Sequence, residues 1–479
     1  MQVFSLAIAQ RLPHPGSPTQ ELLAAALLAA PLLLYYFSLN LLVSAAASCI
    51  FVILAWWRLD MALLTVIITA PFYRFPKTLT IPGITQTFDI SLAEYALGVC
   101  LIAWLLRLII PTPLQRELSG VETKDTWLKW ALPALLVGVA ALSLPFTEHL
   151  RFALREYRVV VIEPALYYFL LVSTLRSPSD VARSLFAFLA LGAAVAAYSL
   201  YHYVFVGVVE AADGVRRVLA VYHSPNALAL FLGRLIPSAL TLSAAAIIMQ
   251  RSWRRAMLPF VTVILLLAAF YITFSRGAWL GIIAAFVFIL IFLLGRRAVF
   301  AVAGLVILSL LAIPLLPWER LLAATPLVQR LYVWQAAVAM LGDHPLTGIG
   351  MDNFLYYYPQ YILPQAALEP DISHPHNLIL DFWLRLGILG LPTLVWLQYQ
   401  FWRAAGVVWR SAGAHEEKVL ALAIMASMVD FLVHGLIDNS YFLIDLAYIF
   451  WFTCALMTVL YFHNQASQPT SSVDGAPRP

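Results

Sequence analysis

Residues 257–294 read MLPFVTVILLLAAFYITFSRGAWLGIIAAFVFILIFLL, and this stretch decides the fold. It holds two apolar runs, 257–274 and 279–294, and its one charged residue is Arg276 between them. A helix of about 20 apolar residues crosses the hydrocarbon core of a bilayer, so each run is close to the length of one span. The segment therefore predicts two neighbouring membrane helices joined by a hairpin.

The rest of the chain has the same character. Of its 479 residues, 62% are hydrophobic and 11% are charged, which leaves too few polar side chains to solvate the surface of a soluble globular protein. The alternation typical of barrel strands is not evident, so we expect an all-α polytopic transmembrane helical bundle of about 12–14 spans. The expected spans are 21–37, 39–57, 61–73, 92–110, 127–146, 159–175, 181–208, 226–248, 257–274, 279–294, 298–316, 378–401, 418–437 and 443–462.

The expected domain plan has three parts. Residues 1–20 form a cytoplasmic segment without the compact apolar core and small-residue cleavage site of a signal peptide. Residues 21–462 form the transmembrane domain, in which 317–377 is a long extracytoplasmic loop with an amphipathic stretch, 327–341, that we expect to lie as a lid on the outer leaflet. Residues 463–479, rich in Ser, Pro and Gln, are expected to be a disordered cytoplasmic tail.

Basic residues orient the bundle. Three alternate loops carry clusters of them, and the positive-inside rule places these loops, with both termini, in the cytoplasm. The clusters are Arg251, Arg254 and Arg255, then Arg296 and Arg297, then Arg403, Arg410 and Lys418. Without the short third span, everything before it would be inverted.

Ten of the 29 Lys and Arg residues then face outward, against the rule, while Arg234 and Arg385 fall within spans. Outward positive charge predicts that an anion binds on this side. The simpler alternatives are interfacial snorkelling and attraction to anionic lipid headgroups. The ten are Arg74, Lys77, Arg151, Arg155, Arg158, Arg216, Arg217, Arg276, Arg320 and Arg330. Of these, we expect Arg74, Lys77, Arg320 and Arg330 to be interfacial anchors.

Two outward motifs suit an anion site. In Ser275-Arg276-Gly277 the glycine allows a tight turn and leaves main-chain N–H groups accessible to a ligand. In the second motif, Arg216 and Arg217 precede Asn226 at the mouth of the next span. Asn226 is expected to cap that helix, whose N-terminal amides then face an anion or simply form an ordinary helix end.

Two further outward motifs are candidates for binding a lipid headgroup and for accepting a proton. Arg151, Arg155 and Arg158 are spaced to line one face of a helix, where lipid headgroups alone would also explain them. His374 and His376 flank a proline where the long loop returns to the membrane. Histidine titrates near neutrality, so a histidine here is a candidate general base.

A metal site is the weaker interpretation of this region. His374, His376, Asp371 and Asp381 match no familiar ligand spacing. The chain also has no Asp-x-Asp motif, which argues against a sugar transferase that holds diphosphate through a divalent cation. We therefore expect no metal and no cofactor.

Taken in order, these motifs resemble the O-antigen ligase and O-antigen polymerase superfamily of membrane glycosyltransferases. The resemblance covers roughly residues 216–462. Each motif is weak alone, and the ordered set is specific. Its parts are Arg217 eight residues before Pro225-Asn226, the Ser275-Arg276-Gly277 hairpin, the segment His344-Pro345-Leu346-Thr347-Gly348-Ile349-Gly350 with Asn353-Phe354, and His376-Asn377 followed by Leu386-Gly387 and Gly390.

The resemblance implies an activity. Such enzymes move a glycan from a lipid carrier, commonly undecaprenyl diphosphate, onto an acceptor hydroxyl at the outer face of the cytoplasmic membrane. It implies that Arg217 and Arg276, with Arg216 nearby, hold the diphosphate and that His376 is the base. His374 would support His376 or bind acceptor. Further candidate substrate contacts are Asn377, Arg151, Arg155, Arg158 and Arg385.

The chain departs from the family pattern at two positions. Ala220 replaces a family glycine, and Arg385 replaces an acidic residue before the Leu-Gly pair. The second change adds positive charge near the lid and suggests a different acceptor. A polymerase and a ligase both remain open, with membrane lipids and a glycan or lipid-core acceptor as partners and no nucleic acid. The alternative from another class is a transporter or flippase of lipid-linked anionic saccharides, which inverted repeats with broken helices would favour.

Overall fold

The computed structural model describes residues 17–80, 87–110, 128–207, 209–212, 215–248, 253–300, 302–304, 325–364 and 371–467. In these residues, eight helices are long and apolar enough to cross a membrane, and four apolar helices are shorter. The predicted all-α polytopic bundle is confirmed. The eight long spans are Thr19–Phe37, Leu92–Ile109, Leu150–Thr174, Pro178–Val206, Pro225–Ile247, Arg276–Phe300, His415–Gly435 and Ile444–Ser467.

The described helices are divided between the two halves of the chain. The first half contains α2 (Pro18–Phe37), α3 (Leu41–Trp57), α4 (Leu59–Thr69), α5 (Leu92–Ile109), α7 (Leu128–Ser143), α8 (Leu150–Glu156), α9 (Glu163–Thr174) and α10 (Pro178–Tyr201). The second half contains α11 (Pro225–Ile248), α12 (Trp253–Tyr271), α13 (Arg276–Leu294), α16 (Thr325–Asp343), α17 (Phe354–Tyr361), α18 (Leu378–Leu386), α19 (Gly390–Ser411), α20 (His415–Gly435) and α21 (Ile444–Ser467).

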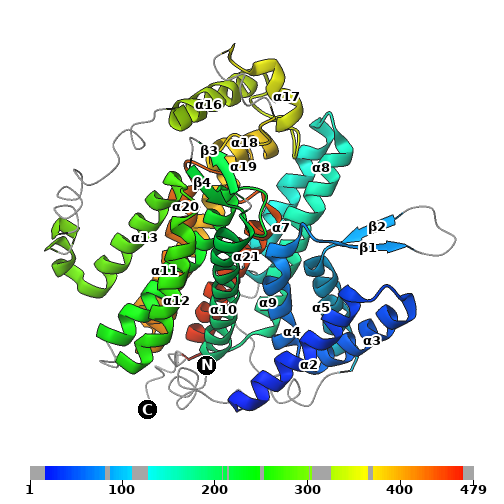
Figure 1. The fold of residues 1–479 in the computed structure, drawn as a ribbon, viewed down its shortest axis with the longest axis vertical. Coiled ribbons are helices and arrows are strands. Elements are labelled where there is room, and N and C mark those ends of the chain that lie inside the picture. Colours follow the sequence, from blue (N-terminus) through cyan, green and yellow to red (C-terminus); the bar gives the residue numbers. More distant parts are fainter. Residues whose placement is uncertain are drawn as a thin grey trace, which may run out of the picture.

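Two antiparallel hairpins complete the architecture. They are β1 (Lys77–Thr80) with β2 (Thr87–Ile90), and β3 (Val209–Ala212) with β4 (Val215–Val218). The β3–β4 hairpin lies at the same end of the bundle as α8, α16, α17 and α18 (Figure 1). This end is called the site end below.

The short third span is present as α4, and its position inside the bundle accounts for its short apolar run. Most of the helix is buried, and the hydroxyl of Tyr167 on α9 donates to the Leu63 carbonyl. Arg58 and Arg183 both bind Glu21, so the adjoining ends of α2, α4 and α10 meet. A helix packed inside a bundle is apolar on all faces, so its sequence gives only a weak signal of a separate span.

α11, α20 and α21 form the centre of the bundle. Arg234 on α11 and Asp430 on α20 form a fully buried ion pair. Gly233 and Gly281 make room for the Asp430 carboxylate, since a Cβ atom at Gly281 would lie 2.3 Å from its Oδ1 atom. Charge inside a membrane bundle is tolerated when it is paired in this way.

The helix expected to form a lid belongs to a small separate core at the site end. The predicted amphipathic stretch 327–341 lies within α16, which packs against α17 and α18 through Val333, Met340, Tyr358 and Leu384. Most of the expected span 298–316, and Arg320, lie outside the described residues.

Several boundaries differ from those expected. The predicted single span 378–401 is wrong: it is two helices, α18 and α19, separated by Gly387 with a φ of +66°. The carbonyl of Leu346 approaches so closely there that a Cβ atom on Gly387 would lie 2.4 Å from it. α21 also extends to Ser467, so the start of the predicted tail is helical.

Candidate active site

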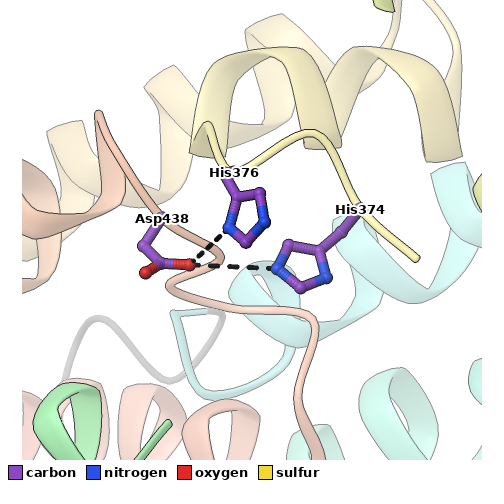
Figure 2. Close-up of side chains that lie close together, drawn as sticks. All are labelled: His374, His376 and Asp438. Atoms are coloured by element: carbon purple, nitrogen blue, oxygen red, sulfur yellow. Dashed lines mark hydrogen bonds and ion pairs between the residues drawn. The ribbon is translucent and has the colours of Figure 1, made fainter. Parts of the chain in front are cut away.

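His376 and Asp438 face one another at the site end. His376 belongs to the loop before α18, and Asp438 to the connection between α20 and α21. The Nδ1 atom of His376 lies 2.9 Å from Oδ1 of Asp438, and Figure 2 shows how the two side chains face one another. Asn377 ties the two loops together because its side chain donates to the Leu436 carbonyl at 2.9 Å. Its Oδ1 atom also accepts from the first amides of α18, so Asn377 caps this helix.

His374 is the second histidine of the cluster. Its Nε2 atom lies 3.8 Å from Oδ1 of Asp438, and its ring centroid lies 4.3 Å from that of His376. The Ser373 hydroxyl lies 3.1 Å from its Nδ1 atom. His374 therefore lies next to both His376 and Asp438.

The ionisation of Asp438 and His374 depends on burial and on the neighbouring charged groups. Burial opposes ionisation of Asp438, but the adjacent His376 with its hydrogen bond, the nearby His374 and Arg330 hold the pKa of its carboxyl well below the usual range. Burial, and then the neighbouring His376, lower the pKa of His374, although Asp438 opposes them. An ionised carboxylate thus faces His376 from a buried position.

Arg330 connects this cluster to the Ser275-Arg276-Gly277 hairpin. Its Nη2 atom lies 3.3 Å from Oδ2 of Asp438, and a Cβ atom on Gly277 would lie 3.3 Å from its Nη1 atom. Arg330 is on the lid helix α16. The sequence interpretation of Arg330 as an interfacial anchor is wrong.

Arg217 lies against the same hairpin. Its Nε atom donates to the Thr273 carbonyl at 2.7 Å, and Nη2 donates to Oδ1 of Asn226 at 2.9 Å. The end of β4 is held there as well, because the Val218 amide donates to the Ile272 carbonyl. The two arginines singled out in the sequence, Arg217 and Arg276, are thereby brought to one turn.

Asn226 orients Arg217, and the start of α11 is capped by another residue. The Ser224 hydroxyl accepts from the Ala227 amide at 3.1 Å. The predicted cap at Asn226 is therefore wrong. Ser224 was detectable in principle, since serine is among the preferred caps.

The start of α13 has the features of an anion site. Ser275 is the N-cap, yet its side chain makes no capping hydrogen bond, and its buried Oγ atom has no hydrogen-bond partner in the described structure. The first amides of a helix have no partner within it, and the helix dipole favours negative charge beside them. Arg276 is exposed at this N-terminus. The hairpin can therefore hold an anion through both amides and guanidinium.

Arg216 does not share this position. Neighbouring residues of a strand point to opposite faces, and Arg217 faces the α12–α13 hairpin. Arg216 is exposed, and its Nη2 atom lies near Gly207 on the other side. The structure thus brings Arg217, rather than both arginines, to the site.

The α8 arginines differ among themselves. Arg151 and Arg155 are exposed and have no ion-pair partner within the described ranges. Arg158 lies beyond α8 and binds Glu94 at 2.6 Å and Glu163 at 2.7 Å. Arg151 and Arg155 are therefore the members that can receive an anionic headgroup without breaking an ion pair.

Two other predicted residues lie inside the protein. Arg385 is 4% exposed and binds Asp381 and Glu156, so a substrate would have to displace these partners to reach it. Lys77, expected as an interfacial anchor, is also buried. Its Nζ atom donates to Ser44 and to two carbonyls at the α2–α3 connection, so that expectation is wrong.

Left-handed backbone marks the motifs of the site. Ala220, Phe274, Asp352 and His376 have φ values of 50° to 53°, which residues with a side chain adopt at a cost. Phe274 directly precedes Ser275. Such residues concentrate where surrounding structure over-determines the backbone, as it does at functional sites.

The ligand atoms of His374, His376 and Asp438 lie within 4.8 Å of one another, close enough to share a metal ion. Asp381, which the sequence offered as a ligand, is instead bound to Arg385, and Asp371 is not part of the group. Arg330 beside Asp438 supplies positive charge where a cation would sit. That charge disfavours a metal.

Residues 261–395 match the family model described as O-antigen ligase. No curated protein matches the chain. The matched range includes the Ser275-Arg276-Gly277 hairpin, Arg330 and both histidines, whereas the motif formed by Arg217 and Pro225-Asn226 lies before it. The chain is a multi-pass membrane protein, and its residues 261–395 are similar to the O-antigen ligase family.

Proposed function

We propose that the chain is a metal-independent, inverting glycosyltransferase that moves a glycan from an undecaprenyl-diphosphate-type lipid carrier onto an acceptor hydroxyl. The reaction would take place at the outer face of the cytoplasmic membrane. The observation that carries this proposal is the bridge made by Arg330, which contacts Asp438 of the histidine cluster and approaches Gly277 of the arginine hairpin. A candidate base and a candidate anion site therefore adjoin.

The diphosphate would bind at the hairpin. Arg217, Arg276 and the first amides of α13 lie at one turn, and Arg330 approaches it from the lid. When the bond between sugar and phosphate breaks, negative charge develops on the leaving phosphate oxygen. Preplaced guanidinium groups and amides stabilise that charge better than water does, because they need no reorganisation.

The base would be His376. Its Nδ1 atom faces the Asp438 carboxylate, an arrangement in which Nδ1–H donates to the carboxylate and Nε2 keeps its lone pair. Nε2 takes the proton of the acceptor hydroxyl while that oxygen forms a bond to the anomeric carbon. The bond from this carbon to the phosphate oxygen breaks, and the lipid diphosphate leaves with the electron pair. A single displacement inverts the anomeric configuration.

Purified protein in proteoliposomes with a lipid-diphosphate-linked glycan and an acceptor tests the proposal. We expect release of lipid diphosphate, a new glycosidic bond and an inverted anomeric centre by NMR. His376→Ala should remove most of this activity, whereas His415→Ala, an exposed histidine at the start of α20, serves as the matched control. Lipid movement without bond formation would instead establish the flippase alternative.

Metal independence is tested in the same assay. We expect an unchanged rate after EDTA treatment, because guanidinium groups supply the charge stabilisation. Activity that is lost with EDTA and restored by a divalent cation would contradict this part of the proposal. It would point to His374, His376 and Asp438 as ligands.

The glycans that accumulate in a deletion strain distinguish a ligase from a polymerase. Accumulation of full-length polymer that is not attached to its acceptor means that ligation was lost. Accumulation of single repeat units means that polymerisation was lost. The family description favours the first outcome.

A further inference from the structure

Arg385 lies at the centre of a buried polar cluster beside the candidate site. Its Nε atom donates to Oδ1 of Asp381 at 2.6 Å, and its Nη1 atom donates to Oε1 of Glu156. Its Nη2 atom lies 3.4 Å from the Ser373 carbonyl. These partners come from α18, from the end of α8 and from the loop before α18.

A fourth contact reaches the other loop of the site. The Cζ atom of Arg385 lies 4.8 Å from the centroid of the Phe442 ring. Phe442 belongs to the connection that carries Asp438, and Ser373 belongs to the loop that carries His376. One guanidinium therefore touches both segments from which the histidine–aspartate pair is built.

We propose that Arg385 is a positioning residue, which holds these two loops at the separation that sets His376 against Asp438 and fixes both to α8 through Glu156. The inference rests on the proposed role of His376 as base. The planar guanidinium directs its donors toward three oxygen atoms at once, which a lysine ammonium on a flexible stem cannot reproduce.

The surroundings make this cluster sensitive to change. Arg385, Asp381 and Glu156 are each less than 9% exposed, and Oδ2 of Asp381 and Oε2 of Glu156 have no hydrogen-bond partner within the described structure. Two carboxylates therefore depend on one guanidinium, and removal of its charge would leave them uncompensated. Asn377 provides a second link between the loops. We thus expect a change at Arg385 to shift the pair rather than separate the loops.

Arg385→Lys tests the proposal because it keeps the positive charge and removes the planar guanidinium with its several donors. Arg183→Lys is the matched control, since Arg183 also binds several carboxylates but does so among Glu21, Asp60 and Asp180, away from the site. We expect Arg385→Lys to lower kcat about tenfold to a hundredfold, the effect of a small misplacement of a catalytic group. The KM for donor should stay within about twofold, because ground-state binding is not altered.

A double variant separates positioning from general destabilisation. If Arg385 acts through His376, Arg385→Lys should cause no further loss when it is added to His376→Ala. An equal loss in both backgrounds, or a wild-type kcat for folded Arg385→Lys, would overturn the proposal. Glu156→Gln, which keeps the acceptor oxygen and the shape, replaces the lysine variant in both arms if that variant is recovered unfolded.

Chemical modification gives a readout that does not need the reaction. Diethyl pyrocarbonate labelling of His376, followed by mass spectrometry, should proceed several-fold faster in Arg385→Lys than in wild type or Arg183→Lys. If Arg385→Lys is labelled faster but the wild-type protein makes no glycosidic bond, the proposed function is wrong and the positioning role is retained. Unchanged labelling would count against the positioning role whatever the wild-type activity.

Discussion

The imidazole of His376 and the carboxylate of Asp438 lie 2.9 Å apart although 62 positions separate them in the chain. The carboxylate also accepts from the Asn439 amide at 2.9 Å and is 2% exposed, so it is held from its own side as well. A fixed carboxylate at Nδ1 sets the tautomer of a histidine and stabilises the imidazolium formed when the ring accepts a proton. This pair is the basis of the first prediction.

Asp438→Asn should lower kcat by about 10²–10⁴-fold, the usual contribution of a general base, because an amide can donate to Nδ1 and hold the ring in the wrong tautomer. Donor binding should change little. Steady-state rates with lipid-linked donor measure this. Glu416→Gln at the opposite end of α20 is the control, and an unchanged kcat for Asp438→Asn would exclude Asp438 as the orienting group.

Arg330→Ala should raise the reaction barrier by about 2–4 kcal/mol, the cost of losing one preorganised donor to developing charge. The variant also removes the contact that brings α16 to Asp438. Single-turnover rates at saturating donor check the prediction, and Arg297→Ala, outside the site, is the matched control. A residue that served only as an interfacial anchor would leave these rates unchanged.

Gly277→Ala should reduce activity because the added Cβ atom would lie 2.7 Å from Cδ1 of Ile437 and 3.3 Å from Nη1 of Arg330. These atoms must move, and Ile437 directly precedes Asp438. Gly98→Ala is the control, since a Cβ atom there meets nothing within 4 Å and alanine favours a helix. Equal activity of the two variants would contradict the close approach of lid and hairpin.

Ala220→Gly should stabilise the protein by about 1 kcal/mol, because Ala220 has a φ of 52°, where a Cβ atom is strained and glycine is not. This conformation suits the glycine that the family resemblance implies at the position. Thermal unfolding in detergent, followed by tryptophan fluorescence, measures the effect. A lower midpoint for Ala220→Gly would show that Ala220 is not strained.

Arg234→Met should destabilise the folded protein by about 3–5 kcal/mol, because it leaves the Asp430 carboxylate buried without its partner. The double variant Arg234→Met, Asp430→Asn should recover part of this loss, since no charge is then uncompensated. Unfolding titrations with SDS compare the three proteins. A double variant no more stable than Arg234→Met would argue against a direct charge pairing.

The membrane class, the apolar helices and the hairpin at Ser275-Arg276-Gly277 were predictable because hydropathy and turn-forming residues are local properties. The order of the motifs also indicated the family. The break at Gly387 was harder to predict, because the carbonyl of Leu346 that approaches it lies in the loop after α16, far away in the sequence. Hydropathy alone does not reveal such a break, because the apolar stretch continues through it.

The sequence by itself determined that this chain is a helical membrane protein with arginines and histidines in an ordered series. Only the tertiary structure decided that Asp438 is the partner of His376, that Arg330 joins the cluster and that Arg385 is buried against Glu156. These contacts span 62, 108 and 229 positions. The physical reason is that an ion pair depends on which helices pack together, and packing is not encoded in the residues adjacent to either partner.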